Sequence, residues 1–461
     1  MKEKKNSEKE EKVLPKEGSK VKKPFDIKDT LTSLKNNDNF VIFLEILVIL
    51  ALVIALVLII KGSPNNSGGA LGDNSGGINS GDNSGAPKQS FTYNAIVEYF
   101  NTSVKVIGYE ATQDEFAKVS QEAVDLLGEY HRLFDIYNEY DGMVNLCTLN
   151  KLVDGQHQKL TVDRKIIDML LYAKEMYTLT DGRMNVAMGS VLSIWHDYRD
   201  EGALQPVKAE LPPMDKLQEA AKHTDINSIV IDEVNSTVWI SDPYTKLDVG
   251  AIAKGYAVER VAEMLERKGK TSYALNIGGN IRTIGYKGNG DKWKTGIRDP
   301  KGDMYDYNEY VELVNESIVT SGSYERYYIV YTGAKCRECD WIYNQNAGIT
   351  NQDVPAGTRP GDLTSSVRCP ECGSKIKRIS EEFHHIIDRE TLMPADRGYL
   401  SVSVICKDSG MGDGLSTALF CMDLDEALAF VNSLDGVEAM FVTEDEAKHY
   451  SNGFLNYTYT P

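Results

Sequence analysis

The stretch that decides the fold runs from Lys246 to Ala257 and reads Lys-Leu-Asp-Val-Gly-Ala-Ile-Ala-Lys-Gly-Tyr-Ala. It gathers an aspartate, two glycines and Lys254 at a predicted strand-to-helix junction, and a helix with one apolar face follows until Gly269. Such a junction offers free backbone N–H groups and the positive end of a helix dipole, which suit a phosphate-bearing ligand. Taken alone, however, the pattern fits turn glycines and a solvated lysine better. The interpretation therefore depends on the rest of the chain.

Four polar patches lie downstream of this junction, and they read Ala274-Leu-Asn-Ile-Gly-Gly-Asn-Ile, Thr320-Ser-Gly-Ser-Tyr-Glu-Arg-Tyr, His384-His-Ile-Ile-Asp and Asp413-Gly-Leu-Ser-Thr. Paired glycines let a backbone approach a flat or phosphorylated ligand closely. Asp413 and Thr417 are four residues apart, so on a helix their oxygens face one side, and hard oxygen ligands so placed suit Mg²⁺. The plainer alternatives are a helix cap for this pair and structural, hydrogen-bonded roles for the histidines.

The pattern of apolar residues between these patches predicts a mixed fold. Helical periodicity spans 116–133 and 164–177, whereas 228–232 and 237–241 alternate like strands. No regular alternation of strand and helix repeats along the chain, so the sequence predicts an α+β fold and argues against a doubly wound parallel sheet.

Together, and in this order, the five patches resemble the family of FAD:protein FMN transferases, the flavin transferases of the ApbE type. Further matches are Tyr99-Phe-Asn-Thr-Ser and Asp181-Gly-Arg-Met-Asn-Val-Ala-Met-Gly-Ser-Val followed by Trp195. The resemblance covers 91–334 and 381–461, apart from one insertion between them. It implies that the protein cleaves FAD with Mg²⁺ and transfers FMN to a Thr or Ser hydroxyl of a target protein, with AMP as the leaving group.

The resemblance also implies roles for single residues. Asp413, Thr417 and the backbone carbonyl of Ala251 would hold Mg²⁺. His385 matches the histidine suspected of deprotonating the acceptor hydroxyl, and His384 is the competing choice. The residues that would contact FAD or line its pocket are Asp248, Lys254, Asn101, Met188, Gly189, Gly278 and Ile387. Three nearby positions, Arg389, Met393 and Gly414, depart from the usual family pattern.

The insertion at 335–380 carries two pairs of cysteines, and they are Cys336 with Cys339 and Cys369 with Cys372. Two CxxC pairs about 30 residues apart are typical of a four-thiolate metal site. The segment also resembles rubredoxin, which implies one iron and a role as an electron carrier. Asp340 replaces the usual glycine after the first pair, so a zinc ribbon remains the alternative. The other cysteines, Cys147, Cys406 and Cys421, are predicted to be buried thiols.

The N-terminal region differs from the rest in charge and composition. Residues 1–39 form a lysine-rich tail, and 40–60 are an apolar run long enough for a single transmembrane helix. Residues 61–90 are rich in Gly, Ser and Asn and predict a flexible linker. Since lysines crowd the tail and none occurs between Lys61 and Lys88, the positive-inside rule puts the tail in the cytoplasm and the catalytic body outside the cell membrane.

The net charge of the chain is -18, and the acidic excess lies in the body. Residues 62–461 hold 38 basic and 59 acidic side chains, which argues against binding nucleic acid through its phosphates. The expected partners are FAD, the membrane and a target redox protein at or outside the membrane. The rival interpretation is a non-catalytic, membrane-anchored flavin and iron electron-transfer protein.

Overall fold

The computed structural model describes residues 88–97, 99–151, 159–303, 305–344, 361 and 368–460. The expected cytoplasmic tail, the expected transmembrane helix at 40–60 and the linker up to residue 87 lie outside these residues. Within the described ranges, no helix is both long enough and apolar enough to cross a bilayer.

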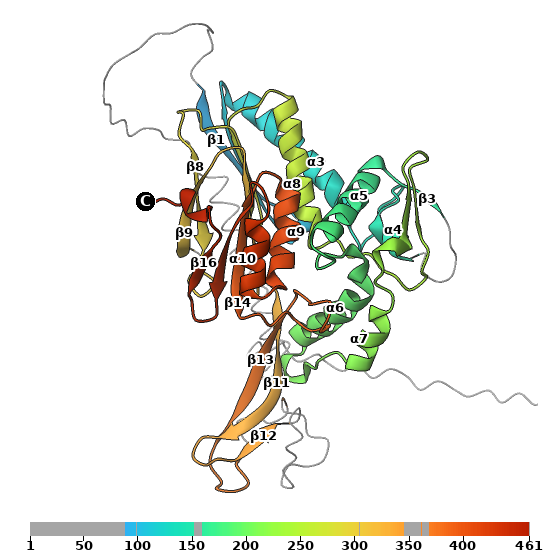
Figure 1. Ribbon diagram of the computed structural model, residues 1–461, viewed down its shortest axis with the longest axis vertical. Helices are drawn as coiled ribbons and strands as arrows, with labels where there is room; N and C mark the ends of the chain where they lie inside the picture. The colour runs from blue at the N-terminus through green and yellow to red at the C-terminus, as the bar shows by residue number, and fades with distance from the viewer. Residues whose placement is uncertain are drawn as a thin grey trace, which may run out of the picture. The chain divides into compact units, whose positions relative to one another are not determined.

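An eight-stranded antiparallel sheet is the centre of the fold (Figure 1), with the strand order β1-β2-β6-β7-β10-β14-β15-β16. Its strands are β1 (Gln89–Val97), β2 (Thr102–Glu110), β6 (Tyr273–Ile277), β7 (Asn280–Ile284), β10 (Ser317–Gly322), β14 (Tyr399–Cys406), β15 (Glu438–Thr443) and β16 (Lys448–Tyr450). Alternate residues of β2, such as Val104 and Val106, are buried, as a sheet with one face on the core requires.

Helices cover the sheet and extend the core beside it. They are α3 (Gln113–Phe134), α4 (Leu146–Lys151), α5 (Arg164–Leu179), α6 (Gly189–Leu204), α7 (Met214–Ala221), α8 (Ala253–Arg267), α9 (Ser409–Phe420) and α10 (Leu424–Asn432). In α3, Phe116, Val119, Ala123 and Leu127 form a buried stripe at helical spacing. The helices α3, α8 and α9 lie side by side and pack against β2, β7, β10 and β14 (Figure 1).

Three small sheets complete the described fold. The first contains β3 (Leu160–Thr161), β4 (Ile229–Asp232) and β5 (Thr237–Ile240), and the second pairs β8 (Trp293–Arg298) with β9 (Tyr307–Leu313). The third contains β11 (Tyr327–Cys336), β12 (Ile342–Asn344) and β13 (Ile376–His384). We call the antiparallel pair β11 and β13 the ribbon, because it runs from the main body to the inserted cysteines (Figure 1).

The α+β class predicted from the sequence is confirmed by this mixture of helices with an antiparallel sheet. The three predicted helices are α3, α5 and α8, and the two predicted strands are β4 and β5, with boundaries within a few residues of those expected. The inserted segment leaves and rejoins the main body through the ribbon.

The crossing of α8 and α9 is close because Gly255 has no side chain. A β-carbon there would lie against the Ser409 carbonyl oxygen and 2.6 Å from the β-carbon of Asp413. The Gly255 N–H donates a 2.8 Å hydrogen bond to Asp413 Oδ2. Farther along α8, the buried Glu259 accepts the Ser409 N–H at 2.8 Å and pairs with Arg282 of β7 at 2.9 Å. These contacts fix where α9 begins.

Replacing Gly255 with alanine is expected to destabilise the protein by about 1–3 kcal/mol, because the new methyl group meets backbone atoms that cannot move aside cheaply. Urea unfolding measures the change in the free energy of unfolding. The matched control is Gly414→Ala in α9, where the nearest atom is the flexible end of Met176 at 2.9 Å. Better helix propensity favours alanine there by about 1 kcal/mol, so an equal loss in both variants would contradict the packing argument.

Candidate active site

Asp413 and Thr417 lie on one helix, α9, as the sequence predicts, and the structure places Asp413 beside the start of α8. Asp413 is buried, and its Oδ2 faces the Gly255 N–H. The Thr417 hydroxyl donates to the Asp413 carbonyl at 3.3 Å and stays partly exposed. Ala251 lies in the turn before α8. Burial raises the pKa of Asp413, while the charge of Lys254 and the hydrogen bond from the Gly255 N–H oppose the rise. A bound cation would add a further positive charge and would therefore favour the ionised carboxylate.

Lys254 and Asp248 lie on either side of this turn and are fixed by different contacts. Lys254 Nζ donates to the Gly278 carbonyl at 3.1 Å, and burial lowers the pKa of this lysine. Asp248 Oδ1 accepts the Gly250 N–H at 2.9 Å, and its other oxygen lies 3.8 Å from His196 Nε2. Lys254 is close enough to Asp413 for its charge to lower the pKa of that carboxyl, whereas Asp248 precedes the turn and faces His196.

The glycines of the site sit where backbones approach each other. Gly278 has a φ of 55° in the turn between β6 and β7, and a β-carbon there would strike the Thr102 side chain. Gly189 N–H donates to the Lys246 carbonyl at 3.0 Å, and a β-carbon at Gly189 would lie 2.7 Å from that carbonyl's carbon. Both glycines therefore hold the segment from Lys246 to Lys254 against its neighbours.

The remaining predicted pocket residues fall into two places. Met188 and Ile387 are buried in one apolar cluster with Trp195 and Tyr328, between α6 and the ribbon. Asn101 is exposed, has a φ of 52° and precedes β2, whose Ser103 carbonyl accepts the Gly278 N–H. The structure thus brings Met188 together with Ile387, and Asn101 toward Gly278.

The two adjacent histidines have different hydrogen bonds. His385 Nδ1 lies 3.1 Å from the Arg326 carbonyl, which can only accept, so Nδ1 carries the proton and Nε2 of the neutral ring is a free acceptor. His384 Nε2 donates to the Ala395 carbonyl at 3.1 Å, and its Nδ1 accepts the Ile386 N–H at 3.2 Å. Both nitrogens of His384 are thus engaged with the backbone, whereas His385 keeps one for chemistry.

The charge state of His385 suits a base. Although His385 is only partly buried, burial lowers its pKa to about 3, and the positive charge of Arg326 acts in the same direction. The imidazole is therefore neutral throughout the physiological pH range. A neutral histidine with a free Nε2 can accept a proton from a hydroxyl group.

Two residues at the site were not predicted from the sequence. The positive charge of Arg326 acts to lower the pKa of Lys254 and His385 and opposes the rise in the pKa of Asp413, so it acts on the cation side and the base side together. His196 lines a pocket with Trp195, Tyr328 and His385. Both residues lie inside or next to patches that the sequence singles out, but no residue spacing gives either of them a role.

Comparisons with known proteins identify the family of the chain. The model of the ApbE family matches residues 100–348 and 372–441, more than half of the chain. The chain belongs to the ApbE family. Two curated relatives, both FAD:protein FMN transferases, come from Klebsiella pneumoniae and Treponema pallidum. The first is 25% identical over 328 residues, which cover 68% of this chain and 82% of the relative. The second is 26% identical over 314 residues, which cover 64% of this chain and 70% of that relative. This ApbE-family chain is therefore an enzyme, an FAD:protein FMN transferase.

Solved structures establish the same fold. The ApbE protein of Thermotoga maritima superposes with a TM-score of 0.59 at 24% identity, covering 81% of this chain and all of that one. The flavin transferase ApbE of Vibrio cholerae gives a TM-score of 0.56 at 20% identity, covering 80% of this chain and 100% of that one.

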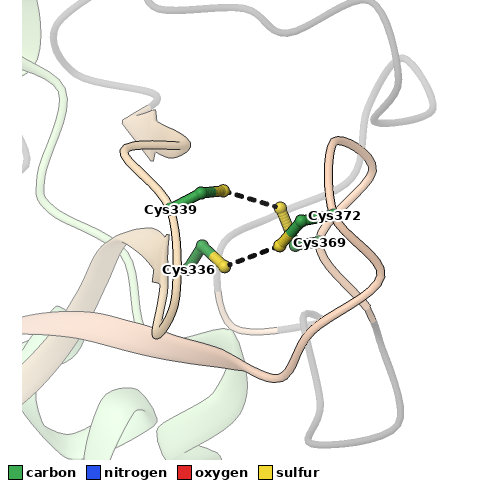
Figure 2. Close-up of side chains that lie close together, drawn as sticks. All are labelled: Cys336, Cys339, Cys369 and Cys372. Atoms are coloured by element: carbon green, nitrogen blue, oxygen red, sulfur yellow. Dashed lines mark hydrogen bonds between the residues drawn. The ribbon is translucent and has the colours of Figure 1, made fainter.

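The four inserted cysteines of this ApbE-family chain converge at the end of the ribbon (Figure 2). Their sulfur atoms all lie within 4.8 Å of one another, with Cys336 Sγ 3.4 Å from Cys372 Sγ and Cys339 Sγ 3.5 Å from Cys369 Sγ. Four sulfurs about 2.3 Å from one tetrahedral metal would be slightly less than 4 Å apart, so this set fits iron or zinc. A rubredoxin family model matches residues 333–379. The predicted convergence of the four thiol groups on one site is therefore confirmed.

The other three cysteines are separate and buried, as predicted. Cys147 lies in α4, Cys406 ends β14, and Cys421 caps α9. Burial raises the pKa of each of these thiols, so they remain protonated. None of them contributes to the four-thiolate site.

Proposed function

We propose that the enzyme transfers FMN from FAD to a Ser or Thr hydroxyl of a target protein in a Mg²⁺-dependent reaction that releases AMP. The observation that carries this proposal is that one charged side chain, Arg326, acts on two kinds of group. The first kind is the buried Asp413 with Lys254, and the second is His385 with a free Nε2. Phosphoryl transfer asks for charge neutralisation on one side and a base for the incoming hydroxyl on the other.

The donor set at the start of α8 fits Mg²⁺. A buried carboxylate of Asp413, the hydroxyl of Thr417 and the carbonyl of Ala251 are hard oxygen ligands, and a site with few protein ligands leaves room for phosphate oxygens and water. A bound Mg²⁺ would supply neutralisation of the pyrophosphate charge. We assign these three residues to that ion.

The side chains and backbone of the site would bind FAD and accept the proton of the acceptor hydroxyl. We assign Asp248, Lys254, Asn101, Met188, Gly189, Gly278 and Ile387 to binding and orienting FAD. Lys254 brings its ammonium group to the side of the site where the phosphates would lie. His385 Nε2 accepts the proton of the acceptor hydroxyl, whose oxygen bonds to the phosphorus of the FMN half. The bond from that phosphorus to the AMP oxygen breaks, and AMP leaves.

The direct test incubates the purified chain with FAD, Mg²⁺ and candidate acceptor proteins. AMP and a covalently flavinylated acceptor are expected in equal amounts, and EDTA is expected to prevent both. Release of AMP without any covalent flavin would indicate hydrolysis of FAD. Absence of both products would contradict the proposed transfer reaction.

We further propose that 40–60 anchor the enzyme by a single transmembrane helix, with the catalytic body outside the cell membrane and a membrane-associated or extracytoplasmic redox protein as target. The support is the apolar run and the lysine-rich tail before it. Protease added to intact cells, or to spheroplasts where an outer membrane is present, should then degrade the body. Full protection that ends only on lysis would contradict this topology.

We also propose iron in the four-thiolate site. The iron-loaded protein is expected to show a visible thiolate-to-iron absorption that bleaches on reduction, and Cys369→Ser should lose both colour and bound metal because one of four ligands is gone. Cys421→Ser, which changes a buried thiol outside the site, is the control and should keep the absorption. A colourless protein with one zinc per chain would contradict the iron assignment.

A further inference from the structure

Asn280 is a buried amide with unmet hydrogen-bonding capacity. It starts β7 directly after the Gly278–Gly279 turn, and its side chain is 0% exposed. Within the described part of the chain, neither its amide oxygen nor its amide nitrogen has a well-formed hydrogen bond. Leaving such a group unsatisfied costs on the order of 1–3 kcal/mol. Folded proteins keep few such groups, and each one calls for an explanation.

The backbone of β7 does not need this side chain. Asn280 pairs with Ile277 through the main chain of the β6–β7 hairpin. Asn145 shows what a structural asparagine looks like in the same protein. Its amide nitrogen donates to the carbonyls of Arg132 at 3.0 Å and Asn138 at 2.8 Å, and its oxygen accepts the Thr148 N–H at 3.0 Å. Asn280 has no comparable set of partners.

The surroundings of Asn280 point to a ligand. The strand β7 packs against α9, and the Asn280 amide lies close enough to Asp413 to lower the pKa of that carboxyl, although neither amide atom makes a hydrogen bond of normal geometry. The turn that precedes it carries the Gly278 carbonyl, which accepts from Lys254 Nζ at 3.1 Å. Asn280 therefore lies near the carboxylate assigned to the cation, and it directly follows the turn that binds the ammonium group assigned to the phosphates.

We propose that Asn280 is a further ligand-contacting residue of the transfer site, and that its amide forms its missing polar contacts with the cation-bound pyrophosphate group of FAD. An amide oxygen is a hard ligand for a divalent cation, and an amide nitrogen donates to phosphate oxygens. This inference rests on the proposed function. It adds a residue that the sequence patterns do not distinguish from the neighbouring turn glycines, and it explains why an unsatisfied amide is kept beside Asp413.

The test replaces Asn280 with leucine, which has a similar size and no polar atoms. Without ligands, the variant is expected to unfold at the same temperature as the parent or higher, because the unsatisfied amide is gone. With Mg²⁺ present, its affinity for FAD is expected to fall tenfold or more, and FAD should raise its unfolding temperature less than it does for the parent. Asn280→Asp, which keeps one oxygen, should retain more of this Mg²⁺-dependent stabilisation than the leucine variant.

Two results would overturn the inference. If the ligand-free Asn280→Leu protein unfolds at a clearly lower temperature than the parent, Asn280 has a structural role. If Asn280→Leu and Asn280→Asp both bind FAD as tightly as the parent does, Asn280 does not contact the ligand. The control is Ser120→Ala in α3, since Ser120 is also 0% exposed with an unpaired hydroxyl but α3 carries no site residue. It should leave FAD affinity unchanged. A parent protein that binds no FAD with Mg²⁺ would overturn the proposed function itself, whereas binding by the parent and variants alike defeats only this inference.

Discussion

Replacing Asp413 with asparagine is expected to reduce AMP release from FAD by roughly 100-fold or more. A metal ion that stabilises developing charge contributes several kcal/mol to the transition state, and each 1.36 kcal/mol is a factor of about ten in rate. Asparagine keeps an oxygen for the Gly255 N–H, so the crossing of α8 and α9 is preserved while the charge that would hold the cation is lost. The measurement is the rate of AMP formation at saturating FAD, over a range of Mg²⁺ concentrations.

The control for Asp413 is Asp425→Asn, which changes an exposed aspartate in the first turn of α10. It should keep the parent rate and the parent dependence on Mg²⁺. If Asp413→Asn kept both as well, the cation assignment on α9 would be wrong.

Replacing His385 with glutamine is expected to slow transfer by about 100- to 10,000-fold, the usual contribution of a general base, while FAD still binds. The parent should also have an unusual pH profile. A base works only when neutral, so kcat/KM falls as the pH drops through its pKa, and the pKa of His385 is lowered to about 3. Transfer is therefore expected to persist at pH 5, where an ordinary histidine with a pKa of about 6.5 would be mostly protonated.

His384→Gln provides the contrast for His385. Because both ring nitrogens of His384 bond to the backbone, its loss should lower the unfolding temperature more than it lowers the transfer rate of the folded protein. A stable His384 variant without activity, beside an active His385 variant, would reverse the assignment.

The parts of the site that the sequence predicts are those in which the signal is local. A metal site is predicted by the spacing of two cysteine pairs alone, Cys336 with Cys339 and Cys369 with Cys372, and their sulfur atoms converge in the structure. Asp413 and Thr417 likewise share one helix. The predicted helices and strands follow from periodicity, which is also a local property.

The parts that could not be predicted depend on contacts between distant segments. Gly255 and Asp413 are 158 residues apart in the chain, and nothing in either patch reveals that α8 and α9 cross there. The two histidines have nearly identical local patterns, and they differ because the Arg326 carbonyl, 59 residues upstream, bonds to one of them. Arg326 and His196 were missed for the same reason, since their roles arise from tertiary packing.

The length of the ribbon limits how its two ends can influence each other. Its register runs from Tyr327 opposite His384 to Cys336 opposite Ile376, so the thiolate site lies nine residues, or about 30 Å, along the strand from the base. At physiological ionic strength, mobile ions screen exposed charges over about 8 Å. The gain or loss of one electron at the thiolate-bound metal should therefore leave the pKa of His385 almost unchanged. If transfer rates differ between the oxidised and reduced protein, the signal must travel through strand pairing or through a bound partner.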